Sequence, residues 1–160
     1  MTSNLSNKWG APYLLHPEID NPSDFLGVEL DPKGEGLKLV GTDGTNERGE
    51  RTIQICNLNR VDLKINRLRK LEDFIAKINL PFILLRKDLL SMNDFGEVLE
   101  VIFDGMDNQA NSDKEEHTLL LRSAVTNTSQ FSSLVLPRLE VSQQAIVLAV
   151  FTEYRALNPF

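Results

Sequence analysis

Seven basic side chains lie within residues 48–70, a segment that has only two acidic ones and a net charge of +5. They are Arg48, Arg51, Arg60, Lys64, Arg67, Arg69 and Lys70. The complete chain of 160 residues has a net charge of −6, so the remainder is strongly acidic. Like charges held close together raise the free energy unless an opposite charge compensates them. The spacing therefore predicts a basic patch that binds an acidic partner or the phosphate backbone of a nucleic acid.

The charge that compensates this segment has two candidate sources. One is internal: residues 88–116 contain nine acidic side chains and one lysine, a net charge of −8, and Glu72 and Asp73 follow the segment directly. The other is a separate molecule. No aromatic residue lies within 48–70, which argues against a site that stacks single-stranded bases. The sequence leaves both sources open.

The residue types that perform nucleophilic or metal chemistry are sparse. Cys56 lies in an apolar pattern typical of a strand, so we expect a buried, unreactive thiol. His16, Glu18 and Asp20 alternate as ligands would on a strand, but Pro17 interrupts them, which favours solvated surface. The sequence contains neither a Gly-x-Ser-x-Gly elbow nor a glycine-rich phosphate loop. We expect no catalytic residue, no metal and no cofactor.

A nuclease site would need carboxylates near a lysine to hold Mg²⁺ and orient water. Asp31 and Lys33 have that local order, and Asp20 and Asp24 lie upstream. Pro32 places the pair in a turn, and the upstream spacing is short. An enzyme with a dispersed carboxylate site therefore ranks last among the candidate functions.

Two short strands are predicted at 25–30 and 37–41. The segment 31–36 between them contains one proline and two glycines, which is typical of a turn. A polar loop over 41–51 follows, and then a strand over 52–58 with Ile53 and Ile55 on one face. These elements would place the first basic side chains at the end of a hairpin loop.

Residues 60–66 alternate between polar and apolar side chains, which predicts a half-buried strand. The period then changes to that of a helix over 67–78, with Asn66 as its cap, and Pro81 is expected to end it. A rival interpretation begins the helix near Asp62. It would bring Lys64 and Arg67 close to the apolar stripe, so the strand is preferred.

The remaining elements are predicted from period and capping residues. They are a strand over 82–85, a helix over 94–106 capped by Asp94, a polar loop over 107–116, a strand or short helix over 118–125, an edge strand over 134–141 containing Pro137, and a helix over 143–157 capped by Ser142. The run from Ala145 to Phe151 is entirely apolar. This pattern indicates that the last helix is deeply buried or covered by a partner.

The fold class predicted is α+β, with an antiparallel sheet and two or three packed helices; the alternative is a three-layer α/β fold. Residues 1–24, with three evenly spaced prolines, are expected to form an arm, and 25–160 a single domain. The chain has one cysteine, no signal-peptide pattern and no apolar run longer than seven residues. We expect a cytoplasmic protein with no membrane contact.

The function predicted is that of a non-catalytic subunit or adaptor in a larger assembly, of which a nucleoprotein complex is one form. It would dock through apolar patches near its termini and present the basic segment 48–70 to an acidic protein partner or a nucleic-acid backbone. One alternative is a small acidic inhibitor, of the immunity type, that masks a basic toxin or nuclease through residues 88–116. An enzyme with a dispersed carboxylate site is the other.

Overall fold

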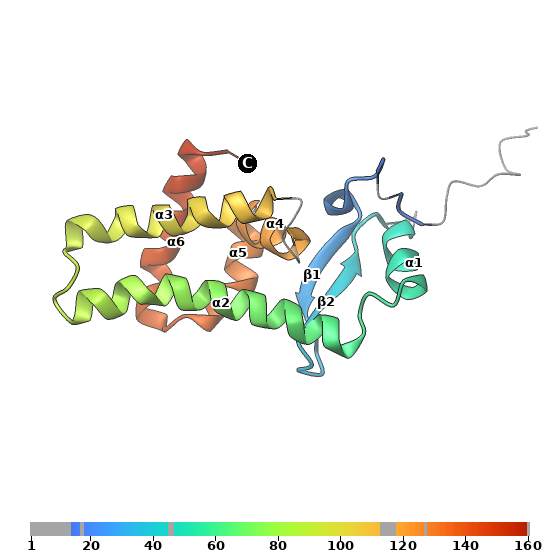
Figure 1. Cartoon of the computed structure of the whole chain (residues 1–160), viewed down its shortest axis with the longest axis horizontal. Helices are drawn as coiled ribbons and strands as arrows, with labels where there is room; N and C mark the ends of the chain where they lie inside the picture. The colour runs from blue at the N-terminus through green and yellow to red at the C-terminus, as the bar shows by residue number, and fades with distance from the viewer. Residues whose placement is uncertain (1–13, 17, 45–46, 113–117, 127, 160) are drawn as a thin grey trace, which may run out of the picture. The chain divides into compact units, whose positions relative to one another are not determined.

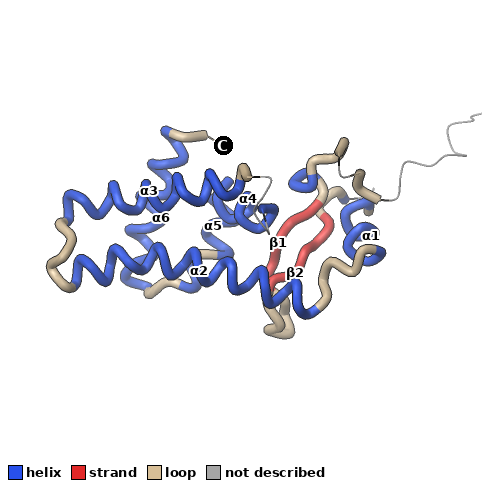
Figure 2. Tube along the Cα trace, in the orientation of Figure 1, coloured by secondary structure: helices blue, strands red, loops and turns tan. Residues whose placement is uncertain are grey.

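Helices dominate the computed structural model, which describes residues 14–16, 18–44, 47–112, 118–126 and 128–159 (Figures 1 and 2). In chain order the elements are the 3₁₀ helix η2 (Pro22–Asp24), β1 (Leu26–Leu30), β2 (Leu37–Gly41), α1 (Arg48–Ile55), α2 (Val61–Arg86), α3 (Met92–Ala110), α4 (Thr118–Thr126), α5 (Thr128–Leu134), the 3₁₀ helix η4 (Leu136–Arg138) and α6 (Val141–Leu157). Within the described residues the fold is therefore α+β with six α-helices and one two-stranded hairpin. The three-layer α/β alternative is wrong.

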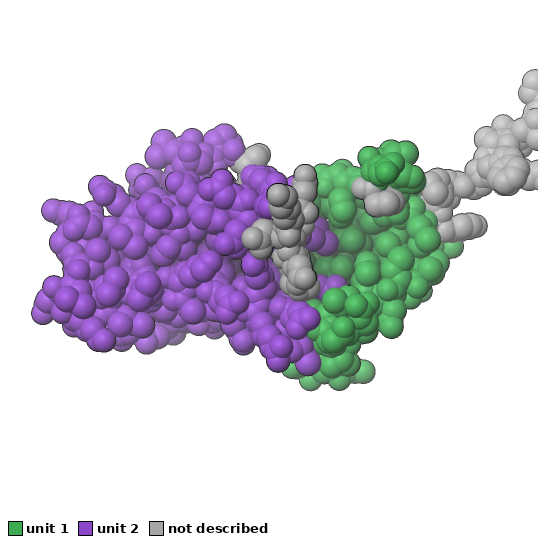
Figure 3. Space-filling model, in the orientation of Figure 1, with its two compact units in different colours: residues 1–64 green, residues 65–160 purple. Residues whose placement is uncertain are grey.

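The chain divides into two compact units, residues 1–64 and 65–160 (Figure 3). Helix α2 begins in the last residues of unit 1 and continues through unit 2. Compactness alone does not show which parts fold independently, so the expected arm over 1–24 and single domain over 25–160 remain predictions. The first thirteen residues of that arm lie outside the described part.

Unit 1 contains the hairpin that the turn residues predicted. β1 and β2 pair antiparallel, with Leu26 opposite Gly41 and Leu30 opposite Leu37. Gly34 and Gly36 have φ angles of 74° and 124°, a region that favours glycine. The hairpin buries Leu26, Val28, Leu37 and Leu39, and α1 adds Ile53.

The predicted strand over 52–58 is wrong, because α1 occupies most of it. The Asp43 carboxylate accepts hydrogen bonds from the backbone N–H groups of Arg48 (2.8 Å) and Gly49 (3.2 Å), which start the helix. Ile53 is 4% exposed and Ile55 is 65% exposed, so the two isoleucines do not share a face. The short alternation of polar and apolar residues was compatible with either a strand or a helix, and the hydrogen bonds that Asp43 accepts favour the helix.

The predicted strand over 60–66 is also wrong, and the rival interpretation, a helix beginning near Asp62, is correct. α2 starts at Val61. The helix does place Lys64 and Arg67 close to its apolar stripe, since each side chain is only 6% exposed. For Lys64, carboxylates of the hairpin turn compensate the buried charge.

Pro81 does not end α2, which continues to Arg86 and replaces the predicted strand over 82–85. A proline inside a helix removes one hydrogen bond and costs about 3 kcal/mol. Burial of Ile78 and Phe82 on the two sides of Pro81 offsets that cost, and the Phe82 ring packs edge-on against Phe95 of α3 with centroids 4.7 Å apart. α2 and α3 thus form an antiparallel helical pair (Figure 1).

Unit 2 is built from helices around an aromatic core. The predicted helix over 94–106 is confirmed within α3, although Ser91 is its cap and Asp94 lies three residues inside. Residues 118–125 are helical, one of the two predicted forms. α3 packs against α4 and α6. Phe103 of α3 contacts the rings of Phe131 and Phe151.

The predicted edge strand over 134–141 is wrong, since the end of α5, η4 and the start of α6 replace it. Pro137 lies in the first turn of η4, where a helical turn needs no backbone donor. The last helix is confirmed, but its cap is Glu140 and not Ser142. The Glu140 side chain accepts the backbone N–H of Gln143, and the Gln143 side chain accepts the backbone N–H of Glu140. This reciprocal arrangement is a capping box.

Candidate functional site

The structure distributes the seven predicted basic residues over helices or their flanks in two units. Arg48, Arg51, Arg60 and Lys64 belong to unit 1, and Arg67, Arg69 and Lys70 belong to unit 2. Arg51, Arg60 and Arg69 are exposed, Arg48 and Lys70 are half-buried, and Lys64 and Arg67 are buried. A partner would therefore meet only part of the predicted set on the surface.

Arg48 acts inside unit 1. Its guanidinium donates to the Asp20 carboxylate at 2.6 and 3.2 Å and to the carbonyl of Leu14 at 3.1 Å. It also lies over the Phe25 ring, 5.0 Å from the centroid. The hydrogen bonds from Arg48 lower the pKa of the Asp20 carboxyl. These contacts fasten the described residues of the predicted arm to α1.

Lys64 is also used internally. Its amine donates to the carboxylate of Asp31 at 2.7 Å and to that of Glu35, both in the hairpin turn. The hydrogen bonds raise the pKa of Lys64 and lower that of Asp31. Asp31, the carboxylate of the nuclease pattern with Lys33, thus serves as a partner of Lys64. Arg60 pairs with Asp62 on the surface at 3.0 Å.

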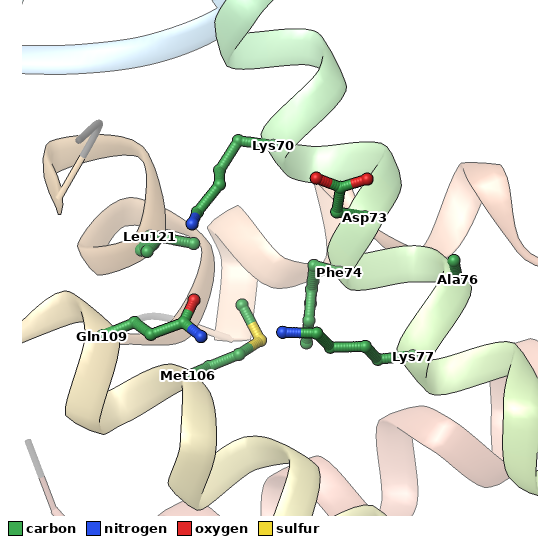
Figure 4. A pocket seen from close by; sticks show the side chains of 8 residues that line it. All are labelled: Lys70, Asp73, Phe74, Ala76, Lys77, Met106, Gln109 and Leu121. Atoms are coloured by element: carbon green, nitrogen blue, oxygen red, sulfur yellow. The ribbon is translucent and has the colours of Figure 1, made fainter. Parts of the chain in front are cut away.

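One predicted residue, Lys70, lines a hollow of about 300 Å³ in unit 2. Figure 4 shows Lys70 and Lys77 reaching from α2 toward Gln109 of α3, while the Asp73 carboxylate points away from the Lys77 amine in this view. Lys70 and Lys77 are seven residues apart, which places them on one face of the helix, two turns from each other. We call this hollow the lysine pocket.

The base of the lysine pocket is apolar. Phe74, Met106 and Leu121 line it and are each 2–3% exposed. The Lys77 ammonium group and the primary amide of Gln109 supply hydrogen-bond donors, Lys70 adds a second positive charge, and Asp73 contributes one negative charge. Donors above a packed apolar base suit a ligand that carries a carboxylate or phosphate next to an apolar group.

Sequence reasoning missed Lys77 and Gln109. The signal for Lys77 was present in its seven-residue spacing from Lys70, but the basic segment was bounded at residue 70, where the run of positive charge ends. Gln109 lies in the stretch predicted as a polar loop over 107–116, of which the first four residues continue α3. Its side chain reaches the pocket only because α3 packs against α2.

The residues weighed for catalysis that the structure describes all lie in unit 1. Cys56 is exposed just after α1, so the predicted buried thiol is wrong. His16 and Asp20 join in a turn, where Asp20 accepts the backbone N–H of His16 at 2.6 Å. No group of three His, Cys, Asp or Glu side chains is placed to hold a metal ion among the residues described.

None of the helices in the described ranges is both long and apolar enough to cross a bilayer. Comparison with models of protein families, with curated proteins and with solved structures finds no match in any of the three. The geometry of the chain is therefore the basis for the functional argument.

Proposed function

We propose that the protein is a non-catalytic binding subunit that holds an acidic segment of a protein partner at the lysine pocket. The observation that carries the proposal is the convergence of Lys70 and Lys77 on a hollow with a buried apolar base. An aspartate or glutamate would pair with the Lys77 ammonium group, to which Lys70 adds a second positive charge nearby, and a neighbouring apolar side chain would lie on Phe74 and Met106.

A protein segment fits this site better than a nucleic-acid backbone. Backbone binding depends on neutralising several phosphates at once. Lys64 is buried against two carboxylates, Arg48 is bound to Asp20, and the chain as a whole has a charge of −6. Such a molecule offers few cations in one place and repels a long polyanion, whereas one or two carboxylates need only the pocket.

The inhibitor alternative keeps one supporting observation. Glu97 and Glu100 are exposed on α3, one turn apart. Asp104, one turn beyond Glu100 on the same helix, accepts a hydrogen bond from the buried Tyr154 hydroxyl at 2.5 Å. A basic partner would have to recognise mainly Glu97 and Glu100, and charge reversal at these two positions tests this alternative directly.

The experiment uses the full chain and a labelled peptide that contains two glutamates followed by phenylalanine. Fluorescence anisotropy at low salt should show binding, and Lys77→Gln should weaken it about tenfold, which corresponds to about 1.4 kcal/mol. Asp73→Asn should strengthen binding, because it removes the negative charge at the pocket. Lys87→Gln is the matched control, an exposed lysine just beyond α2 that does not line the pocket.

Three results would overturn the proposal. They are no binding of the peptide, an equal loss in the Lys87→Gln control, and binding of a random 20-nucleotide RNA that is stronger than that of the peptide and falls steeply with salt. The last result would establish the nucleic-acid version of the hypothesis in its place.

A further inference from the structure

A second hollow lies on α1 in unit 1 and has a volume of about 480 Å³. Its lining in the described part of the chain comes from α1 and the residue before it: Glu47, Glu50, Arg51, Gln54 and Ile55. All five are exposed, and Ile55, the one apolar residue among them, is 65% exposed. A hollow of this size accommodates a large side chain, which would remove Ile55 from water. We call it the α1 hollow.

The first described residues of the chain are bound to the same helix. The backbone N–H of Leu15 donates to the Thr52 hydroxyl at 3.0 Å, and the carbonyl of Leu14 accepts from the Arg48 guanidinium at 3.1 Å. The Thr52 hydroxyl in turn donates to the Arg48 carbonyl at 2.8 Å, so it both accepts and donates. Residues 1–13 therefore join the described chain at a point that is fixed on α1.

The distance from this point to the α1 hollow is short. Ile55 follows Thr52 by three residues, about 4.5 Å along the helix axis. Trp9 precedes Leu14 by five residues, which span up to about 17 Å when extended. The length of the connection therefore allows the Trp9 side chain to reach Ile55.

The composition of residues 1–13 is complementary to the α1 hollow. The segment has no acidic residue, one positive side chain, Lys8, and three large apolar or aromatic residues, Leu5, Trp9 and Tyr13. The lining of the hollow has two glutamates and one arginine, a net charge of −1. Glu50 accepts a hydrogen bond from the Gln54 amide at 3.0 Å, and this neutral partner does not cancel the charge of the carboxylate.

We propose that residues 8–13 of the same chain occupy the α1 hollow, with the Trp9 indole on Ile55 and the Lys8 ammonium group beside Glu50. Because a short connection holds the segment at α1, its effective concentration at the hollow is high, and a modest contact is enough to keep it there. Burial of the indole supplies most of the favourable free energy, since an exposed ion pair contributes little.

This docking has a consequence for the proposed adaptor. The outer face of α1 becomes an internal surface of unit 1, and Trp9 is not offered to a partner at the same time. The interaction rests on other residues than the lysine pocket, which belongs to unit 2. Either proposal can therefore fail without the other.

The test uses the fluorescence of Trp9, the only tryptophan of the chain. In the full chain, the acrylamide quenching constant should be about half of that in the urea-unfolded chain, because the docked indole is covered. Ile55→Ser should raise the constant of the folded chain about twofold, since it removes the apolar contact. Val61→Ser is the matched control, an apolar residue of the same unit that is 53% exposed, does not line the hollow and should change nothing.

A charge exchange tests the second contact. Lys8→Glu and Glu50→Lys should each raise the quenching constant by a smaller factor, about 1.5-fold, because exposed ion pairs are weak. The variant with both substitutions should regain the protection of the original chain. Amide exchange at Leu39 should be the same in all variants, which shows that unit 1 stays folded.

Four results would overturn the proposal. Equal quenching in the folded and unfolded chains would mean that Trp9 is not docked. Protection that survives Ile55→Ser would place the indole elsewhere. Protection that is lost on dilution of the protein would identify a second copy as the binding site. Failure of the charge exchange to restore protection would exclude the contact between Lys8 and Glu50.

Discussion

The two units of this chain bury very different amounts of apolar side chain. Among the described residues, unit 1 buries five apolar side chains, all in the hairpin and α1, whereas unit 2 has a continuous core of leucines, valines and aromatic rings from all of its helices. A small unit cannot cover enough apolar surface to be held by burial alone. We therefore expect single polar contacts to matter more for the stability of unit 1, and redundant packing to matter more for that of unit 2.

The polar contacts of unit 1 each fix one element. The Asn59 side chain accepts the backbone N–H of Leu39 at 2.7 Å and donates to its carbonyl at 2.8 Å, as a neighbouring strand would. Asp43 starts α1, and Lys64 ties the first turn of α2 to the hairpin turn. Because no second contact duplicates any of these, the loss of one should lower the stability of the whole unit.

Unit 2 relies on aromatic packing. Phe131 and Phe151 stack with centroids 3.8 Å apart, and Phe103 lies edge-on to both. The buried Tyr154 hydroxyl bonds to Asp104 at 2.5 Å and to Asp107 at 3.0 Å. Burial and these carboxylates raise the pKa of Tyr154. Here the polar group is an addition to a packed core and not its main support.

The largest effect is expected from Gly49→Ala in unit 1. A Cβ at this position would lie 2.1 Å from the carbonyl oxygen of Phe25, which real structures do not tolerate. Either α1 or the backbone at Phe25 must move, and we expect a loss of more than about 4 kcal/mol in the free energy of unfolding, the range of the most disruptive substitutions. Urea unfolding followed by amide hydrogen exchange of 26–58 measures it.

Gly105→Ala is the matched control, since nothing lies within 4 Å of a Cβ at that position in α3. It should stabilise unit 2 by up to about 1 kcal/mol, the usual difference between glycine and alanine in a helix interior. If Gly49→Ala also removes hydrogen-exchange protection from α3, the two units unfold together and the contrast between them does not describe independent stability.

The next largest effect is expected from Phe103→Ala in unit 2. Phe103 is fully buried and contacts three aromatic rings, so its truncation leaves a cavity and costs about 3 to 4 kcal/mol. Urea denaturation should show the loss in amides of 95–110. Val101→Ala on the exposed side of the same helix should change stability by less than about 0.5 kcal/mol. An equal loss in both variants would contradict a role for the aromatic packing.

A smaller effect is expected from Asn59→Ala. The substitution leaves the N–H and C=O of Leu39 without their side-chain partner, and part exposure of the site lets water replace some of the loss. We expect about 1 to 2 kcal/mol, confined to unit 1. Asn66→Ala, at an exposed position on α2, should be near neutral. Protection of the Leu39 amide against exchange reports the contact directly.

The sequence predicted the elements whose cause is local. The hairpin follows from its proline and glycine turn, and α3 and the last helix follow from apolar period. It failed where contacts distant in the chain decide. Lys64 is helical and buried because carboxylates about thirty residues earlier, Asp31 and Glu35, accept its charge. No pattern within 60–66 contains that information, and the same holds for the packing that carries α2 past Pro81.

The candidate site was predicted only in part, for the same reason. Lys70 was predicted because its charge is visible in the sequence, and its placement at a pocket follows from α3 and α4 packing against α2. Arg48 and Lys64 have the same charge but are used inside unit 1. Charge density predicts where cations lie along the chain, whereas only the tertiary structure shows which of them a partner can reach.

The smallest expected effect is a difference in acid sensitivity between the units. Asp20 and Asp31 have pKa values below the ordinary 3.8, because Arg48 and Lys64 donate hydrogen bonds to their ionised forms. As pH falls through that value, the unfolded chain takes up protons before the folded one does. The free energy of unfolding of unit 1 should therefore decrease with falling pH and level off only when both carboxyls are protonated in the folded state.

Amide resonances of each unit, followed by NMR through urea titrations at pH 7, 4.5 and 3, measure this difference. The midpoint for 26–58 should fall with pH more than the midpoint for 95–110. Asp20→Asn with Asp31→Asn lowers stability at pH 7 but removes these two titrations, so unit 1 should lose much of its acid dependence. If the double variant keeps the full pH dependence, these ion pairs are not what holds unit 1, and its apolar hairpin must account for more of its stability than its size indicates.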